Sequence, residues 1–161
     1  MEIKLTLALP HDEFSVPVAR HVLAGALRTL GVEGSAVTDI ELALTEAATN
    51  VLDHATSTDE YEVSAGISGN ICIIEVIDHG SGFDSTEHGL ANADAGAETG
   101  RGVQLIRALV DRVSFRSVTQ DGTVVHLEKV LDCPEGSTLD RMSLSESKYS
   151  PWSGPDGPRA E

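Results

Sequence analysis

Two pairs of short β-branched segments, each pair joined by a tight turn, most constrain how this chain can fold. Residues 60–68 and 71–78 meet at a Ser-Gly-Asn turn, and residues 112–119 and 123–131 meet at a Gln-Asp-Gly turn. Strands joined by so few residues pair antiparallel, as hairpins. Because no repeated βαβ unit is present, the pattern favours an α+β fold with a mostly antiparallel sheet.

One further strand and a long helix are expected before the first hairpin. Residues 2–9 alternate apolar and polar side chains, which is typical of a half-buried strand. A helix is expected to run from Ser15, as its cap, to about Leu30, with one apolar stripe facing the sheet. That stripe comprises Val18, Val22, Leu23, Ala26, Leu27 and Leu30.

A second and a third helix are expected over about 38–55 and about 102–111. Thr38 followed by Glu41 has the pattern of a capping box, which predicts the start of the second helix. Its apolar stripe comprises Ile40, Leu44, Ala47, Ala48 and Val51. Helices gathered on one face of the sheet would give a two-layer sandwich.

Composition divides the chain once, near residue 131. Residues 1–131 hold the periodic apolar segments and are expected to form one domain. Residues 132–161 hold four of the six prolines and the single tryptophan. A segment so poor in aliphatic side chains cannot offset its ordering entropy by burial, so we expect a disordered tail.

The strong negative charge excludes several kinds of partner. Eleven basic and 26 acidic residues give a formal charge of −15. Such a chain repels nucleic-acid phosphates and anionic membrane surfaces.

No apolar run is long enough to cross a bilayer, and the N-terminus does not resemble a signal peptide. The two cysteines stand outside any metal-binding motif, so we expect reduced thiols in a cytoplasmic protein.

The first segment with chemical potential is TEAATNVLDHA, on the second helix. Glu46 and Asn50 are four residues apart and therefore share a helix face. An amide oxygen can ligate Mg²⁺, which prefers oxygen donors. A carboxylate one turn away can orient or deprotonate a water or hydroxyl. Taken alone, the pair is more typical of an ordinary amphipathic helix that has a polar edge.

The second segment is IDHGSGFD, where a strand ends at Asp78. A carboxylate at a strand end can accept a hydrogen bond from an exocyclic amine such as that of adenine. Gly80 and Gly82 follow, and glycines allow the backbone to approach a flat ring closely. A glycine-rich turn after a strand is also common without any ligand.

The third segment is GRGVQLIRALVD, at the start of the third helix. Gly100 and Gly102 flank Arg101, and an unsatisfied helix N-terminus is an anion site. In a chain of charge −15, a polyphosphate needs such local compensation. The glycines match neither a Rossmann fingerprint nor a Walker A motif.

Together and in this order, the three segments resemble the motifs of the GHKL (histidine kinase-like) ATPases. TEAATNVLDHA is similar to the family's N box, IDHGSGFD to its first glycine box and GRGVQLIRALVD to its second. The segment DGTVVHL resembles the closing motif, with Thr123 at the threonine that supports the adenine-binding aspartate. Within this superfamily the chain looks most like the small anti-sigma-factor serine/threonine kinases.

The resemblance implies a Bergerat-type sandwich that binds ATP with Mg²⁺. Glu46 would be the general base or water-orienting residue, and Asn50 would ligate the Mg²⁺. Asp78 would bind the adenine amine. The remaining implied nucleotide-binding residues are Gly80, Gly82, Gly100, Arg101, Gly102 and Thr123.

The resemblance also implies protein partners. Kinases of this type bind a sigma factor and phosphorylate a STAS-type anti-sigma antagonist, and they often form homodimers. Arg20 lies where they present a partner-facing arginine, although a solvated helix surface is an equally good interpretation. Because Arg101 is the only cation between residues 84 and 106, the alternative is a partner-binding switch without kinase activity. A sensor-kinase fragment that phosphorylates histidine is a third, weaker alternative.

Overall fold

The computed structural model describes residues 2–54, 60–78, 98–118 and 122–142. The elements run in the order β1 (Glu2–Pro10), α1 (Ser15–Thr29), α2 (Gly34–His54), β2 (Glu60–Ser68), β3 (Ile71–Asp78), α3 (Glu98–Leu109), β4 (Arg112–Val118) and β5 (Gly122–Val130). The five strands form one sheet in the order β1-β2-β3-β5-β4, with every neighbouring pair antiparallel. The expected α+β architecture is confirmed.

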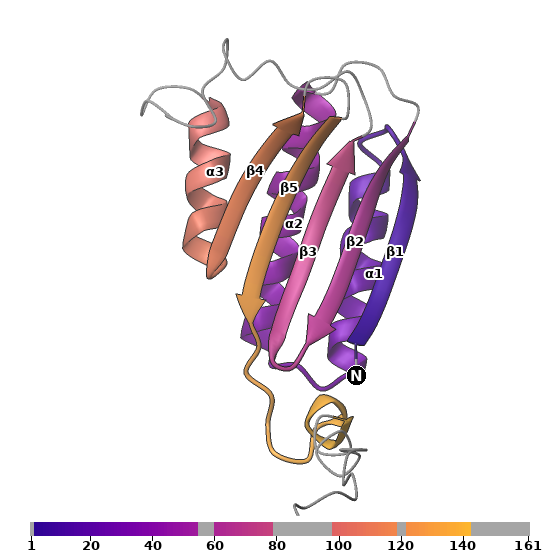
Figure 1. Cartoon of the computed structure of the whole chain (residues 1–161), viewed down its shortest axis with the longest axis vertical. Coiled ribbons are helices and arrows are strands. Elements are labelled where there is room, and N and C mark those ends of the chain that lie inside the picture. Colours follow the sequence, from indigo (N-terminus) through magenta and orange to yellow (C-terminus); the bar gives the residue numbers. More distant parts are fainter. Residues whose placement is uncertain (1, 55–59, 79–97, 119–121, 143–161) are drawn as a thin grey trace, which may run out of the picture.

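Helices α1 and α2 lie behind the sheet and α3 lies beside β4, and the described residues leave the other face of the sheet open (Figure 1). Strand β3 alternates accordingly: Cys72, Ile74 and Val76 are buried toward the helices, and the residues between them are more exposed. Between the two layers lies the core, to which α1 and α2 contribute nearly half of the buried side chains. This arrangement is the two-layer sandwich expected from the sequence.

Helix α2 buries the stripe that the sequence predicts, but it begins earlier than expected. Ile40, Leu44 and Val51 are almost fully buried. The helix starts at Gly34, and the hydroxyl of Thr38 donates a hydrogen bond to the carbonyl of Gly34 at 2.9 Å. The capping-box prediction at Thr38 is therefore wrong, because the hydroxyl bonds back to the preceding turn of a helix already formed.

Helix α1 faces the core with a stripe that only partly matches the predicted one: Leu23 and Leu27 are buried as expected, but Val18, Val22 and Ala26 are exposed. Val18 and Val22 are 51% and 40% exposed, whereas Ala19 and Ala24 are completely buried. Small alanines allow α1 to approach its neighbours closely, which two valines would prevent. Ser15 is the first residue of the helix rather than its cap, and its hydroxyl donates to the carbonyl of Asp12 at 2.6 Å.

Lys129 holds α3 in place relative to α2 and the sheet. Its ammonium donates to Asp39 on α2 at 2.9 Å and to the carbonyl of Leu109, the last residue of α3, at 2.7 Å. A cation at a helix C-terminus satisfies a free carbonyl and opposes the negative end of the helix dipole. This contact fixes the helix whose other end approaches the candidate site.

Residues 132–142 pack on the domain, so its ordered part extends past the expected boundary at residue 131. Leu139 is 5% exposed and belongs to the core, and its N–H donates to the carbonyl of Leu30 at 2.9 Å. The N–H of Glu33 donates to the carbonyl of Asp132 at 3.2 Å. The rest of the expected tail, residues 143–161, lies outside the described residues.

Candidate nucleotide site

Glu46 and Asn50 lie one turn apart on α2, at the edge of its buried stripe. Both are half-buried, while Ala47, Ala48 and Val51 beside them are buried against the core. The packing of these small residues fixes the rotation of α2. The carboxylate and the amide are therefore held on one face, as the spacing predicts.

Gly102 brings the start of α3 against this pair. A Cβ atom at position 102 would lie 2.9 Å from Oε2 of Glu46 and 3.6 Å from both terminal atoms of the Asn50 amide. A side chain here would require the end of the Glu46 side chain to shift, so glycine preserves this approach. Gly100 is buried and Arg101 is exposed in the same turn of α3. The structure thus joins two of the predicted motifs across 52 residues of sequence.

The amide nitrogen of Asn50 is buried without a hydrogen-bond partner among the described residues. A buried donor without a partner costs about 1–3 kcal/mol, so such a group is expected to meet a ligand or water. Rotating the amide by 180° exchanges nitrogen and oxygen, so the same position can offer a donor to a phosphate or an oxygen to a cation. The donor set therefore fits a phosphate-bound Mg²⁺.

Asp78 and Thr123 pair directly across β3 and β5. They are partners in the strand register, and they are 2% and 9% exposed. A buried carboxylate needs hydrogen bonds to compensate for lost solvation, and a threonine on the neighbouring strand can supply one. This register places the side chains on the helix-covered face of the sheet, where α2 packs on β3 and β5.

A buried tyrosine on β2 lies on the other side of Asp78 from Thr123, and the sequence pattern did not single it out. Tyr61 is the register partner of Asp78 on β2 and is 1% exposed. Its hydroxyl hydrogen-bonds to that of Ser15 at 2.8 Å, and the ring of His11 stands edge-on to it. Burial raises the pKa of Tyr61, and the bond to Ser15 opposes that rise. The alternation of β2 could have indicated it, because Tyr61 is the first residue of that strand to face the helices.

Two of the predicted site residues are not described, and one lies apart. Gly80 and Gly82, with the rest of residues 79–97, fall outside the described residues. Arg20 is half-buried on α1. The structure thus assembles Glu46, Asn50 and Gly102 in one group and pairs Asp78 with Thr123 in another.

Other kinds of site find no support among the described residues. They contain no cluster of three or more His, Cys, Asp or Glu side chains suited to hold a metal ion. Burial raises the pKa of Cys72 to about 12, so this thiol stays protonated and is a poor nucleophile. Within the same ranges, no helix combines the length and apolarity that crossing a membrane requires.

Comparison with known proteins agrees with this geometry. Residues 9–129 match the family described as histidine kinase-like ATPase domain. The serine-protein kinase RsbW of Bacillus licheniformis is 30% identical over 147 residues, covering 81% of this chain and 89% of the relative. An anti-sigma F factor of Thermoanaerobacter sp. (strain X514) is 29% identical over 119 residues, covering 70% and 83%.

A solved structure has the same fold. It contains the RsbU and RsbW domains of Rv1364c from Mycobacterium tuberculosis and superposes with a TM-score of 0.64 at 23% identity. The match covers 82% of this chain and 33% of that longer one. With three quarters of its length inside the matched family, the chain belongs to the histidine kinase-like ATPase domain family, as a relative of the RsbW serine-protein kinases.

Proposed function

We propose that the protein binds Mg²⁺-ATP between α2, the start of α3 and the paired residues Asp78 and Thr123 on β3 and β5. The observation that carries this proposal is the contact of Gly102 with Glu46 and Asn50, where the buried amide nitrogen of Asn50 has no hydrogen-bond partner in the described part of the chain. Gly100, Arg101 and Gly102 would meet the phosphates at the α3 N-terminus. Asp78 would accept a hydrogen bond from the adenine amine, with Thr123 supporting it and Gly80 and Gly82 shaping the wall.

The same site is proposed to transfer the terminal phosphoryl group to a serine or threonine of a protein. When bound, Mg²⁺ would neutralise charge that develops on the phosphates. Asn50 would hold that ion, and Glu46 would accept the proton of the attacking hydroxyl or orient it. Phosphoryl transfer depends mostly on positioning, which the packed face of α2 provides.

The proposed partners are a sigma factor, which the protein would sequester, and a STAS-type antagonist, which it would phosphorylate. The similarity to proteins named RsbW and anti-sigma F factor supports this role. Arg20 on α1 is proposed to contact a partner, because arginine is a favoured interface anchor. A homodimer in the cytoplasm completes the proposal.

Calorimetric titration of the purified chain with ATP and Mg²⁺ tests the binding. Asn50→Ala and Asp78→Asn should each weaken binding at least 10-fold. Asn70→Ala, in the β2–β3 turn at the far end of the sheet, is the matched control and should leave it unchanged. No binding by the wild type at millimolar ATP would reject the proposal.

Radiolabelled ATP and co-purified partners separate a kinase from a switch. Transfer of label to a partner protein would establish the kinase, and Glu46→Gln should abolish transfer while binding of ATP persists. The alternative, a nucleotide-dependent partner-binding switch, predicts ATP-sensitive partner binding without label transfer. Only one cation, the exposed Arg101, is expected near the phosphates. Because phosphoryl transfer needs charge stabilisation, this scarcity of positive charge favours slow transfer and supports the switch as the alternative.

A further inference from the structure

A lysine occupies a core-facing position of β5, where the strand pattern would place an apolar residue. Side chains alternate along β5, and Val125 and Leu127, which precede Lys129 on the same face, are buried toward the helices. The register partner of Lys129 on β3 is Cys72, which is 1% exposed. The Lys129 side chain itself is 18% exposed. Lysine is rarely buried unless its charge is paired, so a specific role is expected at this position.

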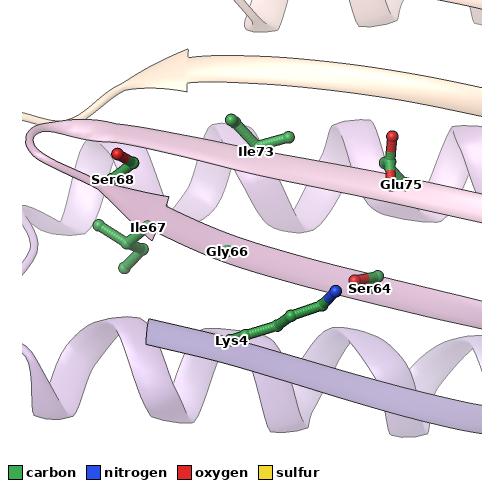
Figure 2. A pocket seen from close by; sticks show the side chains of 7 residues that line it. All are labelled: Lys4, Ser64, Gly66, Ile67, Ser68, Ile73 and Glu75. Carbon is green, nitrogen blue, oxygen red and sulfur yellow. The ribbon is translucent and has the colours of Figure 1, made fainter. Parts of the chain in front are cut away.

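The other lysine within the described ranges has the usual placement for this residue type. Lys4 on β1 is exposed on the open face of the sheet. In Figure 2 its side chain extends over that face toward Ser64, beside a hollow of about 100 Å³. An ammonium group on this surface keeps its hydration, whereas the ammonium of Lys129 has exchanged part of its water for protein partners.

The partners of Lys129 lie on two different helices. Its ammonium donates to Oδ2 of Asp39 on α2 at 2.9 Å and to the carbonyl of Leu109, the last residue of α3, at 2.7 Å. The Asp39 side chain is 35% exposed, so this ion pair is less screened than a pair fully in solvent. One side chain of the sheet therefore connects the first half of α2 to the end of α3.

This connection and the contact at the candidate site are equally spaced on the two helices. On α2, Asp39 precedes Glu46 by seven residues. On α3, Gly102 precedes Leu109 by the same number. Seven residues make almost two full turns and about 10 Å of helix, so the two residues of each helix lie near one face of it. The matched segments 39–46 and 102–109 run antiparallel and are joined at both ends.

Apolar packing alone does not fix the position of α3 along α2. Val103, Ile106 and the adjoining Val110 are buried, and they supply the apolar side of this helix. The hydrophobic effect is not directional, so it favours any position that keeps these side chains covered. A hydrogen bond holds only over a narrow range of distance and angle. The bonds of Lys129 therefore select one position among those that the apolar contacts allow.

Two further bonds attach the end of α3 to β5, on either side of Lys129. The N–H of Asp111 donates to the carbonyl of Glu128 at 2.9 Å, and the Asp111 carboxylate accepts from the N–H of Val130 at 2.7 Å. These bonds hold the end of α3 on the sheet. Lys129 adds the connection to α2, the helix that carries the acid and the amide of the candidate site.

We propose that Lys129 is a positioning residue for the proposed nucleotide site. Through Asp39 and the carbonyl of Leu109 it sets the position of α3 along α2, and it thereby holds Gly102 against Glu46. The inference rests on the proposed function, because Lys129 acts on ATP only through that contact. It binds the far ends of the matched segments, about 10 Å along the helices from Gly102.

ATP titration of the full chain and three variants tests this role. Lys129→Met keeps most of the side-chain volume but removes the charge and the donors, so it should weaken Mg²⁺-ATP binding about 5-fold or more. Lys129→Arg keeps a charged donor and should restore binding to within about 2-fold of the wild type. Arg28→Met is the matched control and should leave ATP binding unchanged. It breaks a 2.9 Å ion pair with Glu41, also on α2, but that pair holds α1 rather than α3.

Urea unfolding of the same variants separates positioning from stability. Lys129→Met and Arg28→Met should both lower the urea midpoint, but only Lys129→Met should also lower ATP affinity. Wild-type ATP affinity in Lys129→Met, or equal losses of affinity in Lys129→Met and Arg28→Met, would overturn the proposal. Asp39→Ala removes the anchor on α2 at a partly exposed position, and it serves if Lys129→Met does not fold. A folded Asp39→Ala variant with wild-type ATP affinity would equally overturn the proposal.

Amide hydrogen exchange supplies a readout that needs no nucleotide. In Lys129→Met the amides of residues 102–106 should exchange about 5-fold faster or more, because loss of the anchor loosens the helix as far as the site. A change confined to residues 109–111 would show that Lys129 acts only locally and would overturn the proposal. A wild type that binds no ATP would reject the nucleotide site, and faster exchange at residues 102–106 would still establish that Lys129 positions α3. ATP binding with unchanged exchange in Lys129→Met would reject the positioning role alone.

Discussion

A Cβ atom at Gly102 would stand 2.9 Å from Oε2 of Glu46, so the start of α3 rests directly on the carboxylate of α2. Real Cβ atoms are not found so close to a side-chain oxygen. One of the two helices, or the Glu46 side chain, would have to move to admit even a methyl group. The geometry of the proposed site therefore depends on a missing side chain.

Gly102→Ala should lower ATP affinity and phosphoryl transfer by about 10-fold or more, because it displaces the carboxylate or α3. Gly25→Ala is the matched control, since Gly25 lies within α1 and has open space around it. That substitution should stabilise the chain by about 0.5–1 kcal/mol through helix propensity. Titration with ATP and urea unfolding of both variants distinguish the two outcomes. Equal ATP affinities would contradict the argument.

Thr123→Val should weaken ATP binding by about 5- to 10-fold, because it removes a hydroxyl beside the buried carboxylate of Asp78 at nearly constant volume. Thr6→Val changes the same residue type on the open face and should not alter binding. Calorimetry at fixed Mg²⁺ measures both. Similar losses in the two variants would point to a general effect on the sheet.

Tyr61→Phe should destabilise the fold by about 1 kcal/mol, since it leaves the hydroxyl of Ser15 without its buried partner. A double-mutant cycle with Ser15→Ala, measured by urea unfolding, isolates this bond. The double variant should lose less stability than the two single variants together. Strict additivity would show that the hydroxyls do not interact.

His126 should make stability depend on pH. Burial lowers the pKa of His126, but the hydrogen bonds that its ring donates to Glu128 and Glu75, together with their negative charges, raise it, and the result lies above the ordinary value. A raised folded pKa adds stability that is complete below the unfolded value of about 6.5 and is lost as the pH rises through the folded pKa.

The free energy of unfolding should therefore exceed that of His126→Gln most near pH 6 and least near pH 9. Chemical denaturation across this range measures the difference. In a Glu75→Gln, Glu128→Gln background this pH dependence should be lost or reversed, because only burial, which lowers the pKa of His126, remains. A difference that grows with pH would reverse the assigned sign.

Leu139→Ala should cost about 2–5 kcal/mol, the usual loss for a buried leucine. The tail expected from composition would predict no change. Thermal or urea unfolding decides between them, with Leu42→Ala as the control, because Leu42 is 45% exposed on α2. An effect of Leu139→Ala no larger than that of Leu42→Ala would place the boundary back at residue 131.

The strands and the buried stripe of α2 were predictable because local patterns determine them. The spacing of four residues predicted that Glu46 and Asn50 share one face of α2. The order of three motifs predicted the family. The stripe of α1 was only partly predictable in this way, because Val18 and Val22 fit a helical period as well as the buried Ala19 and Ala24 do. Only the closeness of the neighbouring elements selects the small residues.

Long-range register accounts for the other features that the sequence could not supply. The position of Tyr61 beside Asp78 depends on how β2 pairs with β3, and the contact of Gly102 with Glu46 depends on how α3 crosses α2. Residues 132–142 look like a tail by composition, yet one leucine at position 139 attaches them to the core. Composition averages over a segment and does not detect a single anchoring residue.

The buried carboxylate of Asp78 has a consequence for the choice of purine. An ionised carboxylate accepts hydrogen bonds and donates none. A 6-amino group offers it a hydrogen, whereas the 6-oxo group of guanine would set one lone pair against another beside the buried Asp78. The proposed site should thus bind ATP more tightly than GTP, because guanine presents an oxygen where adenine presents an amine.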